Sequence, residues 1–145
     1  MGNRNQPIVV EEVFNASVVS VWDAITVPEQ MKLWFFNNIS AFEPVVGFET
    51  SFMVISDDRR FTHQWEIIDV VPNKSIKYNW SYKEYEGAGF VTFELSEKGD
   101  SIILRLTNEG LASFPSEIPE FSRANCEKGW EFFLKQRLKE YIDKL

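Results

Sequence analysis

The sequence feature that most constrains the fold is an alternation of apolar and polar residues with a period of two, which recurs from residue 39 to residue 109. It is clearest in the segment Ser75–Tyr82, where every second residue is large and apolar or aromatic. Side chains of a β-strand point alternately to its two faces, so this pattern predicts a strand with one buried and one solvated face. Turn-forming residues separate each repeat from the next. The region therefore predicts an antiparallel sheet of six strands that share one apolar side.

Shorter elements precede this region. The apolar, β-branched segment Ile8–Phe14 predicts a first strand, which brings the expected number of strands to about seven. The apolar residues of the next segment are spaced three and four apart and predict a helix over residues 17 to 26. Pro28 suits the first turn of a second short helix, and that helix is expected to end near Phe35 to Asn38.

The last part of the chain predicts one long helix, from about Pro119 to Leu145. An apolar stripe from Trp130 to Leu145 predicts that its second half packs on the sheet. The half before Gly129 has a more polar inward stripe that includes Ser122, Asn125 and Cys126. We expect the helix to approach the sheet closely at Gly129, and to leave a cavity of about 300 Å³ or more before it, in the size range of small-molecule sites.

Composition excludes several classes of function. The net charge is −7, and the basic residues are dispersed, so binding to nucleic acid is not expected. With Cys126 as the only cysteine and His63 as the only histidine, the chain offers neither a disulfide nor a cysteine- or histidine-rich metal site, and no Ser-His-Asp triad is expected. No metal or cofactor is therefore predicted, and an enzyme is less expected than a binding protein.

Aromatic residues make up 15% of the chain, which requires either a large core or a cavity walled by rings. No composition change divides the chain, so residues 1 to 145 are interpreted as a single domain. The stretch Met1–Pro7 lacks the apolar segment of a signal sequence, and no apolar run approaches 18 residues. These observations predict a cytoplasmic protein without a membrane anchor.

Several short segments of the sequence, taken in order, resemble those of a known family. They begin with Val21–Pro28 and Trp34-Phe35, continue with Val46-Gly47, Pro72–Trp80 and Val91–Leu95, and end with Gly129-Trp130. They resemble the family named after the activator of the ninety-kilodalton heat-shock chaperone's ATPase, a branch of the START-like (SRPBCC) superfamily. The resemblance implies an α+β helix-grip fold, in which a curved antiparallel sheet wraps around a long C-terminal helix, with two short helices after the first strand.

The resemblance implies less about function, because fold does not fix function. The eukaryotic cochaperone has an additional N-terminal domain that makes much of the chaperone contact, and we expect no room for it in 145 residues. Many family members have a histidine before the glycine that ends the last strand, whereas this chain has Asn108-Glu109-Gly110. A role that depends on that histidine is not carried over.

The leading hypothesis is a protein that binds a small apolar or aromatic ligand, without catalysis, between the sheet and the last helix. A chaperone-linked stress-response protein acting through its surface is the first alternative, and an enzyme of the polyketide cyclase or aromatase type is the second. A chaperone contact and a homodimer are left open as further partners. The residues expected to line the ligand site are Phe52, His63, Trp65, Tyr78, Trp80, Phe93, Asn125 and Trp130.

Overall fold

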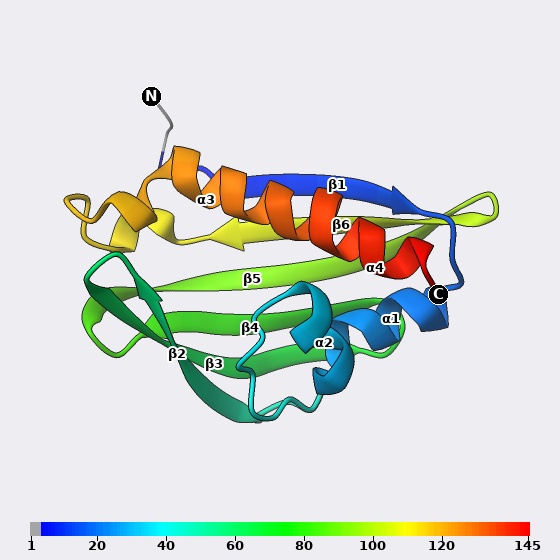
Figure 1. Cartoon of the computed structure of the whole chain (residues 1–145), viewed down its shortest axis with the longest axis horizontal. Helices are drawn as coiled ribbons and strands as arrows, with labels where there is room; N and C mark the ends of the chain where they lie inside the picture. The colour runs from blue at the N-terminus through cyan, green and yellow to red at the C-terminus, as the bar shows by residue number, and fades with distance from the viewer. Residues whose placement is uncertain (1–3) are drawn as a thin grey trace.

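The computed structural model describes residues 4–145 and shows the expected α+β helix-grip architecture. One curved antiparallel sheet forms the back of the molecule, and the C-terminal helix packs on its inner face and runs along β1 and β6 (Figure 1). Two short helices cover the same face near β3 and β4. Residues 1–3, at the start of the N-terminal stretch discussed above, lie outside the described residues.

Within the described chain the sheet has six strands in the order β1-β6-β5-β4-β3-β2. The strands are β1 Ile8–Phe14, β2 Glu49–Ser56, β3 Arg59–Val71, β4 Ser75–Tyr82, β5 Tyr85–Lys98 and β6 Ser101–Glu109. The prediction of seven strands was wrong by one, because the segment that starts at Ile39 forms no strand before β2. Its buried residues Ile39 and Phe42 are three positions apart, a spacing that cannot place both on one face of a strand.

The two short helices lie where the sequence predicts them. Helix α1 spans Val18–Thr26, and the side chain of Ser17 caps it by accepting a 3.1 Å hydrogen bond from the Ser20 amide. Helix α2 spans Pro28–Trp34 and begins with its proline. The indole of Trp34 is fully buried and donates a 2.7 Å hydrogen bond to the carbonyl of Ala24, which joins the two helices.

The C-terminal helix begins later than predicted. Pro119–Phe121 forms a separate 3-10 turn, η2, and Ser122 then caps helix α3, Arg123–Glu131. The helix continues as a π-helical segment, η3, Phe132–Leu138, and ends with α4, Lys139–Asp143. The later start follows from Ser122, whose side chain accepts a hydrogen bond from the Asn125 amide and so defines a new N-terminus.

The π-helical segment has a basis in the sequence. Trp130, Leu134, Leu138 and Ile142 are all buried, and each follows the previous one by four residues. An α-helix has about 3.6 residues per turn, so a spacing of four drifts by about 40° at each step. The wider π-helical turns reduce this drift and keep the four side chains on the sheet.

The same helix also covers the β1 edge of the sheet. The ammonium groups of Lys135 and Lys139 donate hydrogen bonds of 2.7 and 2.6 Å to the carbonyl oxygens of Glu11 and Val13 in β1. The amide of Val13 donates to the carboxylate of Glu12. These backbone groups of an edge strand therefore have side-chain partners.

Candidate functional site

The candidate site is a pocket of about 210 Å³ between the inner face of the sheet and the first half of the C-terminal helix. Its position is the one that the sequence predicts, but its volume is smaller than the 300 Å³ expected. Twelve residues line it, most of them aromatic or apolar: Phe36, His63, Trp80, Tyr82, Asn108, Leu111, Glu120, Phe121, Cys126, Gly129, Trp130 and Phe133.

Three of the residues predicted to line a ligand site do line this pocket, namely His63, Trp80 and Trp130. Four others lie in the packed core beside it, where they contact other rings. These four are Phe52, Trp65, Tyr78 and Phe93, with exposed fractions between 1% and 6%.

The ring that fills the space in front of the core residues comes from Phe35, at the end of α2 (Pro28–Trp34). Its centroid lies 5.7 Å from that of Trp65 and 6.5 Å from that of Phe93. The aromatic residues of the sheet therefore pack largely on another ring, and the pocket occupies only the remaining part of the interior. The neighbouring Phe36 lines the pocket itself.

Asn125 lies outside the pocket. Its side chain is exposed, and its amide group donates a 2.7 Å hydrogen bond to the carbonyl of Pro119. It stabilises the start of the helix, and Cys126, the next residue, faces the pocket instead.

The expected close approach at Gly129 was wrong. A Cβ atom added to Gly129 would meet no atom within 4 Å, and the residue lines the pocket. The missing side chain therefore adds to the pocket, because a larger residue at this position would project into the open space.

His63 is a buried, neutral acceptor at the pocket wall. Its Nδ1 lies 3.0 Å from the carbonyl oxygen of Phe61, which can only accept, so Nδ1 carries the hydrogen. Burial lowers the pKa of His63 to about 4, although the Phe61 hydrogen bond and the charge of Glu84 act in the opposite direction. Among the described residues Nε2 has no hydrogen-bond partner, and it keeps a free lone pair at neutral pH.

Tyr82 supplies a hydroxyl group next to His63. The indole nitrogen of Trp80 donates a 2.7 Å hydrogen bond to the Tyr82 oxygen, and burial raises the pKa of Tyr82 above its ordinary value. The thiol of Cys126 contacts the Glu120 carbonyl oxygen at 3.5 Å, and burial raises its pKa to about 11. The thiol is therefore protonated at neutral pH, which argues against a nucleophilic role.

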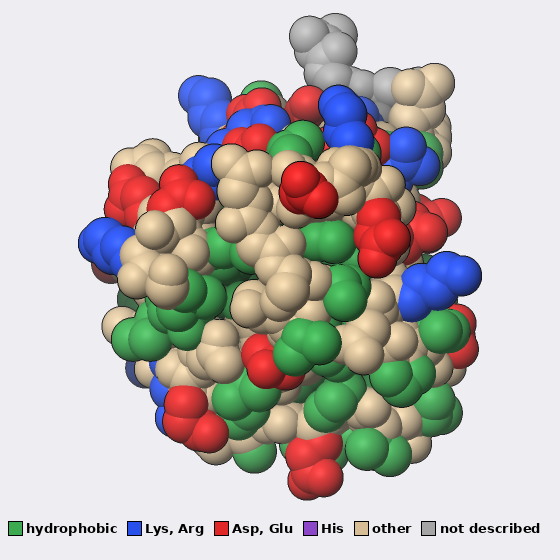
Figure 2. Space-filling model, turned by 90° about the vertical axis from the view of Figure 1, so that its right-hand side faces the viewer, with side chains coloured by type: hydrophobic (Ala, Val, Ile, Leu, Met, Phe, Trp, Pro, Cys, Tyr) green, Lys and Arg blue, Asp and Glu red, His purple; other side chains and the backbone are tan. Residues whose placement is uncertain are grey.

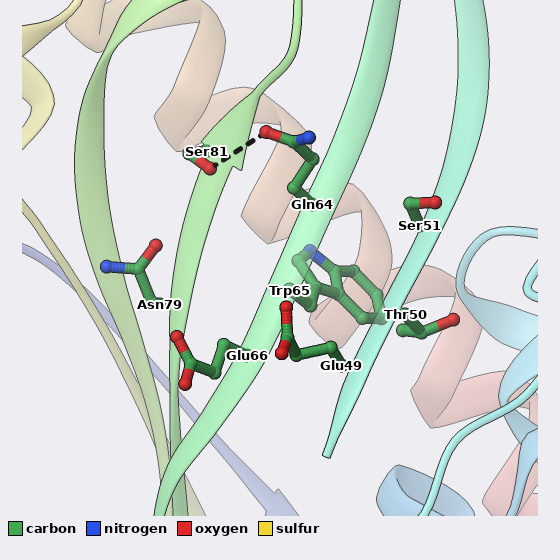
Figure 3. A pocket seen from close by; sticks show the side chains of 8 residues that line it. All are labelled: Glu49, Thr50, Ser51, Gln64, Trp65, Glu66, Asn79 and Ser81. Carbon is green, nitrogen blue, oxygen red and sulfur yellow. Dashed lines mark hydrogen bonds between the residues drawn. The ribbon is translucent and has the colours of Figure 1, made fainter. Parts of the chain in front are cut away.

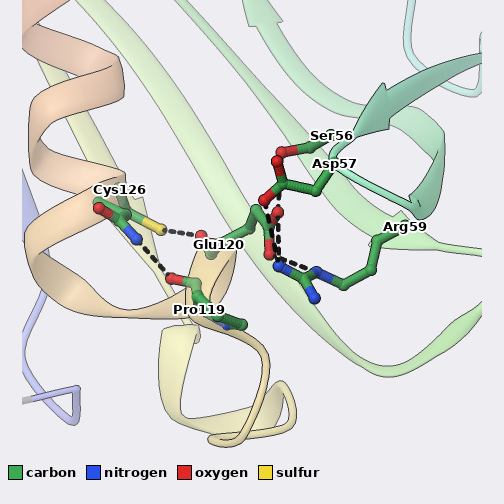
Figure 4. A network of polar contacts seen from close by, with 7 residues as sticks. Ser56, Asp57, Arg59, Pro119, Glu120 and Cys126 are labelled. Carbon is green, nitrogen blue, oxygen red and sulfur yellow. Dashed lines mark hydrogen bonds and ion pairs between the residues drawn. The ribbon is translucent and has the colours of Figure 1, made fainter.

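The segment between β6 and α3 closes one side of the pocket with Leu111, Glu120 and Phe121. Figure 4 shows how Glu120 is held there: Ser56 donates to its carboxylate at 2.7 Å, and Arg59 donates to it at 2.8 and 3.2 Å. Burial raises the pKa of Glu120, but the hydrogen bonds from Arg59 and Ser56 outweigh this effect and the pKa is lowered. We call residues 110–122 the closing segment.

Two larger hollows of the surface lie on the outer face of the sheet. One of about 390 Å³ is lined mainly by polar side chains of β2, β3 and β4, including Glu49, Gln64 and Glu66 (Figure 3). Glu49 and Glu66 are register partners, yet the hollow is open to solvent and no apolar wall encloses it. It lacks the enclosure expected of a small-molecule site.

Neither a metal site nor a membrane span is found in residues 4–145. No group of three or more His, Cys, Asp or Glu side chains in this range is arranged to hold a metal ion. None of the helices in the same range combines the length and the apolar character needed to cross a bilayer.

Solved structures with the same architecture come from several bacteria. The chain is 26% identical to protein MLL2253 from Mesorhizobium loti, with a TM-score of 0.73 and coverage of 96% of this chain and 98% of that one. It is 20% identical to the Aha1 dimer from Colwellia psychrerythraea, with a TM-score of 0.70 and coverage of 94% and 96%.

A third similar structure is DynU16, a protein of the dynemicin biosynthetic locus. The identity is 25%, the TM-score is 0.72, and the match covers 94% of this chain and 47% of DynU16.

No curated protein matches the chain. A family model does match: the model of activator of Hsp90 ATPase homolog 1-like proteins covers residues 15–143, which include both short helices, five strands of the sheet and the whole C-terminal helix. The fold, the order of its elements and this match together place the chain in the activator of Hsp90 ATPase homolog 1-like (AHSA1) family of the START-like superfamily.

Proposed function

We propose that this protein binds a small, uncharged aromatic or apolar molecule in the pocket between the sheet and α3. The observation that carries the proposal is the gap that Gly129 and Cys126 leave opposite the rings of Trp80 and Phe36. The volume suits the ligand class, since a cavity of about 150 Å³ lined by apolar side chains is known to hold a benzene molecule.

The electrostatics of the pocket favour an uncharged ligand. His63 and Cys126 are neutral at neutral pH, as their shifted pKa values require, and the hydroxyl of Tyr82 is neutral as well. The one acidic side chain in the lining, Glu120, is already paired with Arg59. A charged ligand would lose its hydration without gaining a free counter-charge.

The test is to fill the pocket from the helix. Gly129→Leu places a side chain in the open space and also favours the helix, because leucine has a higher helix propensity than glycine. The matched control is Ala124→Leu, on the exposed side of the same helix. Binding of naphthalene would be followed by ¹H–¹⁵N NMR shifts of the labelled protein.

We expect naphthalene to shift the resonances of pocket residues in the wild type and in Ala124→Leu. In Gly129→Leu we expect the affinity for naphthalene to be at least about tenfold lower. Equal binding in all three proteins would refute the pocket as the site. Native mass spectrometry of freshly purified protein, compared with its denatured mass, would reveal a ligand that co-purifies.

A second candidate is contact with a chaperone through the surface. The family description names activation of the Hsp90 ATPase, and the end of the molecule in Figure 2 exposes apolar side chains over its lower half, with acidic side chains among them. Val19 of α1 and Leu33 of α2 are more than half exposed. We expect no stimulation of a purified cognate chaperone ATPase at stoichiometric amounts, and a several-fold stimulation would favour this candidate over ligand binding.

Catalysis on a bound polyketide chain, as in cyclases of this superfamily, is the third hypothesis. The likeness to DynU16, from a biosynthetic locus, is compatible with it. The neutral thiol of Cys126 and the low pKa of His63 provide no strong nucleophile or base, so we place binding first.

A further inference from the structure

We propose that the pocket is specific for a phenol-type ligand, an aromatic molecule whose hydroxyl group donates to Nε2 of His63 and accepts from the hydroxyl of Tyr82. This inference rests on the proposed function and names the class of ligand. It adds a hydrogen-bonding requirement to the size of the ligand, because an apolar pocket alone would bind any ring of suitable size.

The acceptor is His63. Its Nδ1 hydrogen is committed to the Phe61 carbonyl, and its ring is fixed by stacking on Phe52, at a centroid distance of 4.8 Å and an interplanar angle of 10°. The remaining polar atom, Nε2, belongs to a residue that lines the pocket and has no partner in the described chain. Nε2 is not fully enclosed by protein atoms, so a hydroxyl group in the pocket can reach it and donate to its lone pair.

The donor is Tyr82. Its oxygen already accepts a hydrogen bond from Trp80, which orients the hydroxyl group, and its own hydrogen has no acceptor among residues 4–145. The side chain lines the pocket. The hydroxyl group is therefore available to donate to an oxygen atom of a ligand.

One ligand hydroxyl can satisfy both groups. His63 in β3 and Tyr82 in β4 are direct register partners, and their ring centroids lie 4.8 Å apart. A single oxygen between them would donate its hydrogen to Nε2 and accept the hydrogen of Tyr82. A hydrocarbon could do neither, and a carboxylate could not donate.

The rest of the lining suits the ring that carries this hydroxyl. Phe36, Trp130 and Phe133 offer aromatic faces on the helix side of the pocket, with Phe36 and Phe133 centroids 5.1 Å apart. Asn108 adds an uncharged amide from β6. The lining thus combines aromatic walls with one adjacent donor and acceptor, which is the pattern of a phenol and not of a fatty chain.

The experiment compares 2-naphthol with naphthalene, which differ only by the hydroxyl group. The measured quantity is the ratio of their dissociation constants in the wild type, in His63→Phe and in Tyr82→Phe, each obtained by NMR titration. Two hydrogen bonds of ordinary net strength, about 1 kcal/mol each, correspond to about a tenfold or greater preference for 2-naphthol. We expect this preference in the wild type and a loss of about fivefold in each variant.

Tyr141→Phe is the matched control, because the Tyr141 hydroxyl donates to Gln30 away from the pocket and the ratio should stay as in the wild type. The wild-type ratio does not depend on the folding of any variant. Equal affinities for both compounds in the wild type would overturn the inference while leaving the proposed function in place. If neither 2-naphthol nor naphthalene binds, the proposed function is overturned as well.

Discussion

The guanidinium group of Arg59 and the carboxylate of Glu120 are joined by two hydrogen bonds, of 2.8 and 3.2 Å, across 61 residues of sequence. The pair connects the first residue of β3 to the closing segment. Because Glu120 lines the pocket, the contact holds one wall of the pocket in place.

We predict that Arg59→Ala accelerates ligand exchange. Loss of the pair should let the closing segment open more often, so that the association and dissociation rates of 2-naphthol both rise several-fold while its dissociation constant changes little. Stopped-flow fluorescence measures both rates. Arg105→Ala, which removes the exposed pair with Glu11 on the outer face, is the control, and equal rates in the wild type and both variants would contradict this role.

We predict that lowering the pH from 7 to 4 destabilises the protein, because His63 is buried in its neutral form. In the unfolded chain a histidine binds a proton near pH 6.5, whereas folded His63 binds one only near pH 4. Between these values the unfolded state binds more protons, so the free energy of unfolding decreases as the pH falls. The slope is about 1.4 kcal/mol per pH unit, and the total loss is about 3 kcal/mol by pH 4.

Urea unfolding at intervals between pH 7 and pH 4 measures this effect. Carboxylates also lose stabilising contacts at the low end of this range, since the pKa values of Glu84 and Glu120 are lowered. The informative quantity is therefore the difference between the wild type and His63→Phe. A difference that stays constant from pH 6.5 to pH 4 would show that His63 titrates normally.

The hydroxyl of Tyr78 is buried without a hydrogen-bond partner among the described residues. Removing an unsatisfied buried polar group relieves its desolvation penalty, so Tyr78→Phe should raise the free energy of unfolding by about 1 kcal/mol. Trp34→Phe is the contrasting variant, because it removes the hydrogen bond to Ala24 and part of a fully buried ring. Thermal and urea unfolding would test both, and a destabilised Tyr78→Phe would contradict the prediction.

Two glycines should respond oppositely to alanine. Gly129 lies within α3 with open space beside it, so Gly129→Ala should stabilise the protein by about 1 kcal/mol through helix propensity. Gly110 has a φ of 87°, and a Cβ there would lie 2.7 Å from the Ala88 carbonyl oxygen, so Gly110→Ala should be destabilising. Equal effects of the two substitutions on urea unfolding would refute this distinction.

Local patterns predicted most of the fold because each element carries its own signal. Ser17 and Pro28 defined the starts of the two short helices, and strict alternation defined β4. The segment from Ile39 to Phe42 lacked such a signal, and its buried residues were mistaken for a strand. The π-helical segment was not predicted either, although the spacing of four between Trp130, Leu134, Leu138 and Ile142 is a signal for it.

The site was less predictable, because its composition depends on contacts between distant segments. Phe35 and Phe36 stand at the end of a short helix, and nothing local shows that one fills the interior while the other faces a pocket. Tyr82 and Asn108 could have been predicted as lining residues, since they continue the inward-facing alternation of β4 and β6. Asn125 was misplaced by one position, because a cap at Ser122 turns it toward Pro119.

The lysines that cover β1 make the two borders of the sheet unequal. Lys135 and Lys139 occupy backbone oxygens that a strand from another molecule would need, and Glu12 occupies an amide of the same border. At the opposite border, Asn38 bonds the Met53 carbonyl, while the side chains of Met53 and Ile55 are 43% and 63% exposed. Self-association of this protein by strand addition, whether in an ordered assembly or in aggregation, would therefore proceed through β2, and a charged residue in place of Ile55 would be the change that suppresses it.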